Sequence, residues 1–153
     1  MDQEAATIRI NPAMALQKPL EDYIQYLEKM TTRSVRLLDK LAAPGMHYAD
    51  SLYDVRGSAE IAEIFRRRLE TVHSPKIRIR DHAWGQDGQT VYLRWTFSCR
   101  RDGVEDIRQG VSEIMFSKDG LVLAHMDYPD MYERLSPPSR SLLGRIFPRL
   151  NKP

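Results

Sequence analysis

The sequence predicts an α+β fold in which a curved antiparallel sheet wraps around three N-terminal helices and encloses a pocket. Apolar residues recur at helical spacing in the first half of the chain and alternate with polar residues in the second half. Tight-turn sequences such as Asp102-Gly103 separate the alternating segments, so neighbouring strands should run antiparallel. A sheet that curls around helices leaves a cavity, which is the usual place for a small ligand.

Composition narrows the class of protein. The chain has 153 residues, of which 42% are hydrophobic and 29% are charged, a balance typical of one globular domain. Its net charge of +2 is too close to neutral to indicate a nucleic-acid partner. The N-terminal residues MDQEAATIRI carry acids and lack the apolar run of a signal peptide, and no segment is apolar for long enough to span a membrane. We therefore expect a cytoplasmic protein.

The sequence predicts no cofactor. Cys99 is the only cysteine, which excludes an internal disulfide or a cysteine metal cluster. The four histidines lack the spacing of metal ligands, and no glycine-rich phosphate-binding motif is present. Neither a metal nor an organic cofactor is therefore expected.

The first half of the chain is predicted to be mainly helical. Residues 1–17 show no clear period and should form a loose arm. A helix should follow from Pro19 to Met30, because proline suits the first helical turn and apolar residues then recur at helical spacing. Thr31 or Thr32 can cap a second helix that stops at Pro44-Gly45.

A short strand and a third helix complete this half. The strand should run from Met46 to Asp50, and a turn should lead to Gly57. Ser58 is a plausible cap for a helix with a clean apolar face through Ile61 and Phe65. The run of arginines at 66–68 on that helix is interpreted as a solvated face.

The second half is predicted to form four antiparallel strands and then a tail. Alternation predicts strands over residues 76–84, 91–99, 107–116 and 121–128. The domain should span residues 18–135. Residues 136–153 form a basic amphipathic tail, which is expected to pack on protein in preference to a membrane.

Strand alternation also predicts the pocket wall. If Trp95 faces inward, its neighbours at every second position on three strands do so too. The predicted wall residues are Tyr48, Leu93, Trp95, Phe97, Ser112 and Ile114, with Cys99, Leu123, His125 and Asp127. A carboxylate among these apolar groups should have a raised pKa and could move a proton beside a carbonyl group.

Two segments resemble a known family. The order of elements, with DSLYDVRG before the third helix and GVSEIMFSKDGLVLAHMDYPD at the end, resembles the nuclear transport factor 2-like superfamily, in particular its SnoaL-like branch. That branch includes polyketide cyclases, ketosteroid isomerase and limonene epoxide hydrolase. The resemblance covers residues 19–135 and implies a cone-shaped, cystatin-like α+β barrel that often dimerises through its convex sheet face.

The resemblance also implies roles for single residues. Asp50 matches the general base of ketosteroid isomerases, and Tyr23 matches the tyrosine that donates a hydrogen bond to the substrate carbonyl. Ser112 stands where those enzymes have a protonated aspartate, which makes steroid isomerisation itself doubtful. Asp127 matches the last acid of the epoxide hydrolases, but apolar Trp95 and Phe97 replace that set's arginine and other aspartate, so epoxide hydrolysis is disfavoured.

Each candidate catalytic residue has a structural alternative. Tyr23 could be a core residue, and Asp50 could bond backbone N–H groups of a turn. His125 could be a hydrogen-bonded strand residue, and Asp127 could anchor the end of the sheet through an arginine.

Two functions are therefore weighed most closely. The first is acid–base chemistry on an apolar carbonyl compound, of the isomerase, cyclase or dehydratase type. The alternative is a binding or accessory module that uses the same pocket without turnover; a transport role is unsupported by the sequence. Beyond the small molecule, the sequence predicts a second copy of the chain as partner, with no nucleic acid and no membrane.

Overall fold

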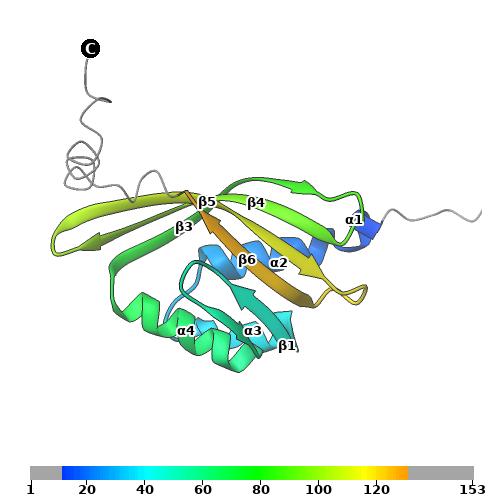
Figure 1. Ribbon diagram of the computed structural model, residues 1–153, viewed down its shortest axis with the longest axis horizontal. Coiled ribbons are helices and arrows are strands. Elements are labelled where there is room, and N and C mark those ends of the chain that lie inside the picture. The colour runs from blue at the N-terminus through cyan, green and yellow to red at the C-terminus, as the bar shows by residue number, and fades with distance from the viewer. Residues whose placement is uncertain (1–11, 131–153) are drawn as a thin grey trace, which may run out of the picture.

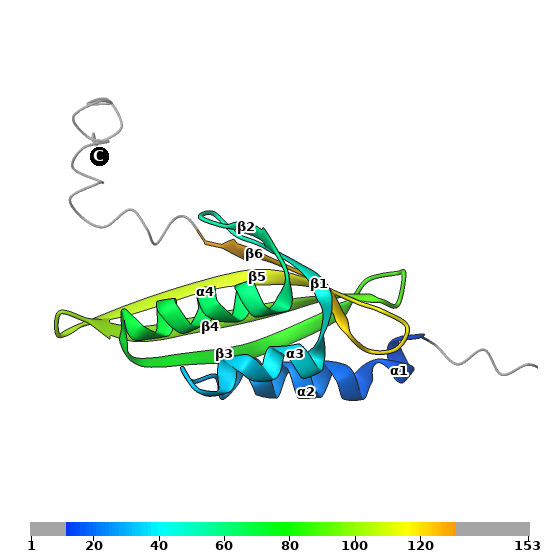
Figure 2. The same cartoon turned by 90° about the horizontal axis from the view of Figure 1, so that it is seen from below.

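The computed structural model describes residues 12–130, which form a curved sheet with helices packed against its concave face (Figures 1 and 2). The helical elements are α1 (Pro12–Ala15), α2 (Gln17–Glu28), the 3₁₀ helix η1 (Ser34–Leu37), α3 (Leu38–Leu41) and α4 (Ser58–Glu70). The strands are β1 (Ala42–Ala49), β2 (Asp54–Arg56), β3 (His73–Trp84), β4 (Thr90–Arg101), β5 (Val104–Phe116) and β6 (Val122–Pro129). The α+β prediction is confirmed.

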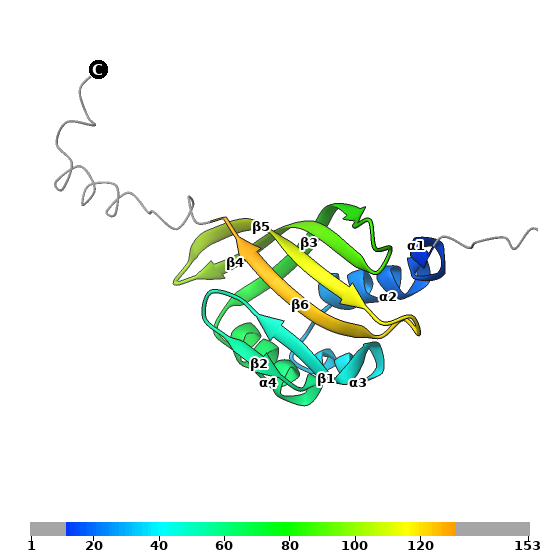
Figure 3. The same ribbon diagram turned by 45° about the vertical axis from the view of Figure 1, so that its right-hand side comes forward.

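The six strands form one open sheet in the order β2-β1-β6-β5-β4-β3 (Figure 3). The pairs from β3 to β6 are antiparallel, as their connecting turns predict. The expectation of a wholly antiparallel sheet is wrong at one pair, because β1 runs parallel to β6. No turn joins these two strands, since α4 and other strands lie between them in the chain. The sheet does not close, so the predicted barrel is a half-wrapped cone.

The predicted helices form, but their boundaries differ. The first helix, predicted from Pro19 to Met30, runs from Gln17 to Glu28, and Gly57 instead of Ser58 is the N-cap of α4. Thr31 Oγ1 accepts the backbone N–H of Ser34 at 3.1 Å, but the N-cap of the second helical segment is Arg33, not Thr31 or Thr32, and the segment breaks into η1 and α3. The segment ends at Leu41, and β1 already contains Pro44 and Gly45. Proline is tolerated there because the β1–β6 register shifts between residues 42 and 47. Pro44 therefore lies outside the hydrogen-bonded ladder, where its lack of an N–H group costs no hydrogen bond.

The last strand departs from simple alternation near its start. Phe116 pairs with Val122 whereas Met115 pairs with Ala124, so the strand carries a bulge at this point. The extra residue turns Val122 into the core and leaves Leu123 exposed. The expectation that Leu123 faces inward is therefore wrong, although His125 and Asp127 keep the predicted side.

Two further predictions concern the ends of the chain. Part of the predicted N-terminal arm is helical, since α1 and the start of α2 lie before residue 18. The predicted tail at 136–153 lies outside the described residues. Among residues 12–130, no helix is both long and apolar enough to cross a membrane.

The convex face of the sheet exposes several large apolar side chains. Tyr92, Val111, Met115 and Tyr128 are exposed on neighbouring strands β4, β5 and β6, and Arg94 and Glu113 lie beside them in the β4–β5 register. A contiguous patch of this kind favours association. We therefore propose that two copies pair through this face.

Light scattering should then give twice the chain mass of 17.8 kDa at micromolar concentration. Replacing Val111 with glutamate should shift the protein to monomer, because a charge would enter the centre of the patch. A monomer mass for the unaltered chain would contradict the proposal.

Candidate active site

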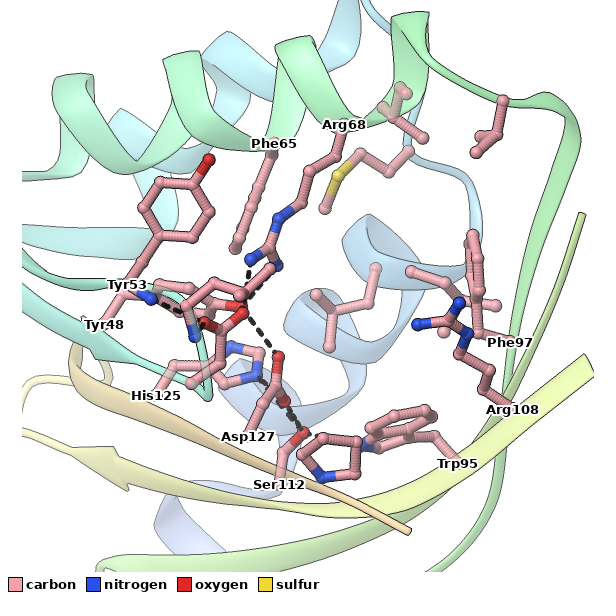
Figure 4. Close-up of a pocket in the computed structure, with 18 of the residues that line it drawn as sticks. Tyr48, Tyr53, Phe65, Arg68, Trp95, Phe97, Arg108, Ser112, His125 and Asp127 are labelled. Atoms are coloured by element: carbon pink, nitrogen blue, oxygen red, sulfur yellow. Dashed lines mark hydrogen bonds and ion pairs between the residues drawn. The ribbon is translucent and has the colours of Figure 1, made fainter. Parts of the chain in front are cut away.

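A cavity of about 450 Å³ lies between the concave face of the sheet, α2 and α4 (Figure 4). Its inner end is formed by buried side chains, among them Tyr48, Ser112 and His125. Its mouth is formed by exposed residues of the loop after β1, including Leu52 and Tyr53. The remaining wall is largely apolar; it includes Leu27, Met30, Phe65, Leu69, Val72, Ile77, Ile79, Trp95 and Phe97.

Strand register brings the polar groups together at the inner end. Tyr48 on β1 pairs with His125 on β6, and Ser112 on β5 pairs with Asp127 on β6. These residues come from three adjacent strands and share one face, so their side chains meet although up to 79 residues separate them in the sequence. The hydrogen-bond network at this end follows from that placement.

Asp127 is the centre of the network. Its Oδ1 accepts hydrogen bonds from His125 Nε2 at 2.8 Å and from the Ser112 hydroxyl, and its Oδ2 accepts from the Tyr48 hydroxyl at 2.9 Å. Its side chain is 23% exposed and lines the cavity. Burial acts to raise the pKa of this carboxyl, but His125 and the hydroxyl donors outweigh burial and hold the pKa below its usual range.

His125 is oriented from its other side by the core. Its Nδ1 lies 2.7 Å from the Tyr23 hydroxyl. With the proton on Nε2, the ring donates to Asp127 and accepts from Tyr23, which satisfies every partner. Tyr23 is fully buried and contributes nothing to the cavity wall, so its expected direct bond to a substrate carbonyl is wrong. Tyr23 reaches the site only through His125.

Asp50 binds backbone N–H groups of the turn that follows it, which was the structural alternative to a catalytic role. Its Oδ1 accepts the backbone N–H groups of Leu52 at 2.7 Å and Tyr53 at 2.8 Å, while its Oδ2 binds Arg68 and the Tyr48 hydroxyl. The side chain is 9% exposed and lines the cavity. Burial raises its pKa, but the turn N–H groups and the Arg68 guanidinium outweigh it and lower the pKa. The predicted raised pKa is wrong for both aspartates because each has several donors.

Besides Leu123, three predicted wall residues lie elsewhere, and one of them, Cys99, is buried without lining the cavity. Leu93 and Ile114 are fully buried in the hydrophobic core and do not line the cavity. That part of the concave face is covered by α2, whose Leu20 and Tyr23 belong to the same core cluster. Trp95, Phe97, Tyr48 and Ser112 do line the cavity, whereas Asp54 is exposed and pairs with His47 at 2.7 Å.

Arg68 is the residue that the sequence analysis missed. It donates to the Tyr48 hydroxyl at 2.9 Å, pairs with Asp50, and lies over the Tyr53 ring with 4.8 Å between guanidinium carbon and ring centroid. Arg66 and Arg67 both pair with Glu63 on the more exposed side of α4, and Arg67 also lines the cavity. Helical spacing could have separated them, because Arg68 falls three residues after the buried Phe65 and four after Ile64.

The arrangement brings a carboxylate and a guanidinium to one phenol oxygen. Asp127 and Arg68 both hydrogen-bond to the Tyr48 hydroxyl. An apolar ligand in the cavity would meet a base and a cation at the same end, a pairing suited to proton abstraction beside a carbonyl. Within residues 12–130, no three His, Cys, Asp or Glu side chains are grouped as a metal site requires.

Comparison with known proteins agrees with this fold. Residues 23–125 match the sequence family of the SnoaL-like domain. A putative SnoaL-like polyketide cyclase from Jannaschia sp. CCS1 superposes with a TM-score of 0.66 at 12% identity, covering 86% of this chain and 96% of that one. An epoxide hydrolase of M. tuberculosis, described as LEH-like, gives 0.63 at 18% identity over 88% of this chain and 97% of that one.

A putative polyketide cyclase from Xanthomonas campestris pv. campestris gives a TM-score of 0.61 at 12% identity, over 80% of this chain and 96% of that one. No curated protein sequence matches the chain significantly. At these identities the solved structures establish the fold.

Proposed function

Because the chain belongs to the SnoaL-like domain family, we propose that it binds an apolar carbonyl compound in this cavity and moves a proton on it. The observation that carries the proposal is the cavity-facing Asp127 carboxylate, held by His125, Ser112 and Tyr48 at the end of an apolar wall. A base fixed by three donors is positioned before the substrate arrives, which favours catalysis.

The proposed step is an enolisation. Asp127 takes a proton from the carbon beside the carbonyl group, and the C–H electron pair forms the C=C bond of an enolate while the carbonyl electrons move to oxygen. The Arg68 guanidinium stabilises that oxyanion, the role for which the sequence had suggested Tyr23 and Ser112. Return of the proton to the same or another carbon gives exchange, isomerisation or ring closure on an internal electrophile.

The lowered pKa of Asp127 bears on the kind of substrate. A weak base takes a proton more readily from an acidic carbon than from a weakly acidic one. A carbon between two carbonyl groups meets this requirement better than a simple ketone. The likeness of the fold to the polyketide cyclases of Jannaschia and Xanthomonas is consistent with such a substrate.

Deuterium exchange tests the proposal. The protein should accelerate exchange at the central carbon of ethyl 3-(2-naphthyl)-3-oxopropanoate in deuterium oxide, measured by NMR. Replacing Asp127 with asparagine should lower the catalysed rate by about 100-fold or more, the usual contribution of a general base. Asp54→Asn is the matched control, because Asp54 is exposed outside the cavity. A rate for Asp127→Asn equal to that of the control would overturn the role of Asp127.

A second candidate function is ligand binding without turnover. It is favoured by one observation, that the donors around Asp127 and Asp50 already satisfy both carboxylates. This alternative predicts saturable binding of the same keto ester by calorimetry with no acceleration of exchange. Epoxide hydrolysis stays disfavoured, because apolar Trp95 and Phe97 stand where the epoxide hydrolases have an arginine and an aspartate.

A further inference from the structure

The far end of the cavity carries positive charge. Arg101 and Arg108 line the cavity, and Figure 4 shows Arg108 beside Phe97, away from Asp127. Both arginines bind the same carboxylate: Asp106 lies 2.9 Å from Arg108 and 3.3 Å from Arg101. Two guanidinium groups against one carboxylate leave an excess charge of +1 at this end.

The other arginines of the cavity are balanced by carboxylates. Arg68 pairs with Asp50. Arg67 pairs with Glu63, and Arg66, which shares Glu63, also pairs with Glu70. The arginines of β4 and β5 are therefore the part of the wall whose charge exceeds that of its partners. Arg108 uses two of its N–H groups on Asp106, through Nε and one terminal nitrogen, and a guanidinium has five.

The strand fixes the separation between this charge and the acid–base end. Arg108, Gly110 and Ser112 share the concave face of β5, and Ser112 pairs with Asp127. Arg108 and Ser112 are four positions apart on the strand, so their Cα atoms are about 13 Å apart. Between them Trp95 pairs with Gly110 and Phe97 pairs with Arg108, which gives an aromatic wall along the whole span.

We infer that the ligand is an apolar acid, with its reacting carbonyl at Asp127 and Arg68 and a carboxylate at Arg101 and Arg108. The inference takes from the proposed function that this cavity is the ligand site. A guanidinium recognises a planar carboxylate through paired N–H bonds, and the aromatic wall suits a fused-ring or similarly flat middle section. Asp106 competes with the incoming carboxylate and limits its affinity.

Calorimetry with a matched pair of ligands tests the inference. The probes are 6-acetyl-2-naphthoate, which has a ketone and a carboxylate at opposite ends, and its uncharged methyl ester. The carboxylate should bind about tenfold more tightly than the ester, as expected for one charge-assisted contact. Arg108→Gln should remove most of this preference. Arg94→Gln should keep it, because that arginine lies on the convex face and pairs with Asp81.

Asp106→Asn supplies a result of opposite sign. Removing the competing carboxylate should tighten binding of 6-acetyl-2-naphthoate several-fold and leave the ester unchanged, which a merely structural role for Asp106 would not produce. Equal affinities for acid and ester, a preference that survives Arg108→Gln, or binding of neither probe would each overturn the inference. A preference for the acid in a protein that accelerates no exchange would uphold this inference while the catalytic proposal fails. Exchange without any preference would do the reverse.

Discussion

Above pH 10 the free energy of unfolding is expected to fall by up to about 4 kcal/mol for each further pH unit, because three tyrosines are buried in the core. Burial raises the pKa of Tyr23, Tyr26 and Tyr48 above the ordinary value of 10.0, and the carboxylate of Asp127 raises that of Tyr48 further. The unfolded chain therefore loses three protons that the folded chain keeps. Their contribution is fully present below pH 10 and is lost as the pH rises past it.

Urea titrations followed by tryptophan fluorescence between about pH 9 and pH 11 would measure this slope. Tyr26→Phe should reduce the slope by about a third, since one of the three titrating groups is removed. Tyr53→Phe is the control, because that side chain is 39% exposed and lies outside the convex face. Equal slopes for the original chain and Tyr26→Phe would contradict the explanation.

Local sequence patterns predicted the elements of the fold well. The period of two from residue 76 onward predicted β3 to β6, and the turn residues predicted their antiparallel pairing. The parallel β1–β6 pair was beyond those patterns, because it depends on where β1 lies after α4 and the intervening strands have been placed. The bulge at Leu123 was missed for a related reason, since a bulge is a property of two strands together.

The site was predicted where it depended on strand alternation and missed where it depended on packing. Trp95, Phe97, Ser112 and Asp127 face the cavity, as period-two counting requires. Leu93 and Ile114 also lie on the concave face by the same alternation, but α2 covers them. Strand alternation does not predict which part of a sheet face a helix will cover. The raised pKa predicted for the pocket aspartates was wrong for a similar reason. The pKa values of Asp50 and Asp127 depend on hydrogen-bond donors from Tyr48, Arg68 and the turn after Asp50, which a strand pattern does not predict.

Gly110→Ala is expected to destabilise the protein by about 1–3 kcal/mol or more, a typical cost of inserting atoms into a packed site. A Cβ atom at this position would lie 2.6 Å from Cζ2 of Trp95, 2.6 Å from the carbonyl oxygen of Tyr128 and 2.8 Å from Cα of Pro129. Two of these neighbours are backbone atoms of β6 and cannot rotate away. Either the β5–β6 pair separates or the Trp95 ring is pushed into the cavity.

The second response would also damage the site, because Trp95 Nε1 donates to the Ser112 hydroxyl at 2.9 Å and Ser112 in turn donates to Asp127. Thermal unfolding should therefore show a lowered melting temperature, and the fluorescence of Trp95 should change even in the folded state. Gly45→Ala is the matched control: that glycine also lies in a strand, a Cβ atom added to it would meet no atom within 4 Å, and the change should alter stability by no more than about 0.5 kcal/mol. Both variants could instead have the melting temperature and the fluorescence of the original chain. In that case the position of Trp95 does not depend on the absence of a side chain at Gly110. The close packing of β5, β6 and the aromatic wall is then not what holds Ser112 against Asp127.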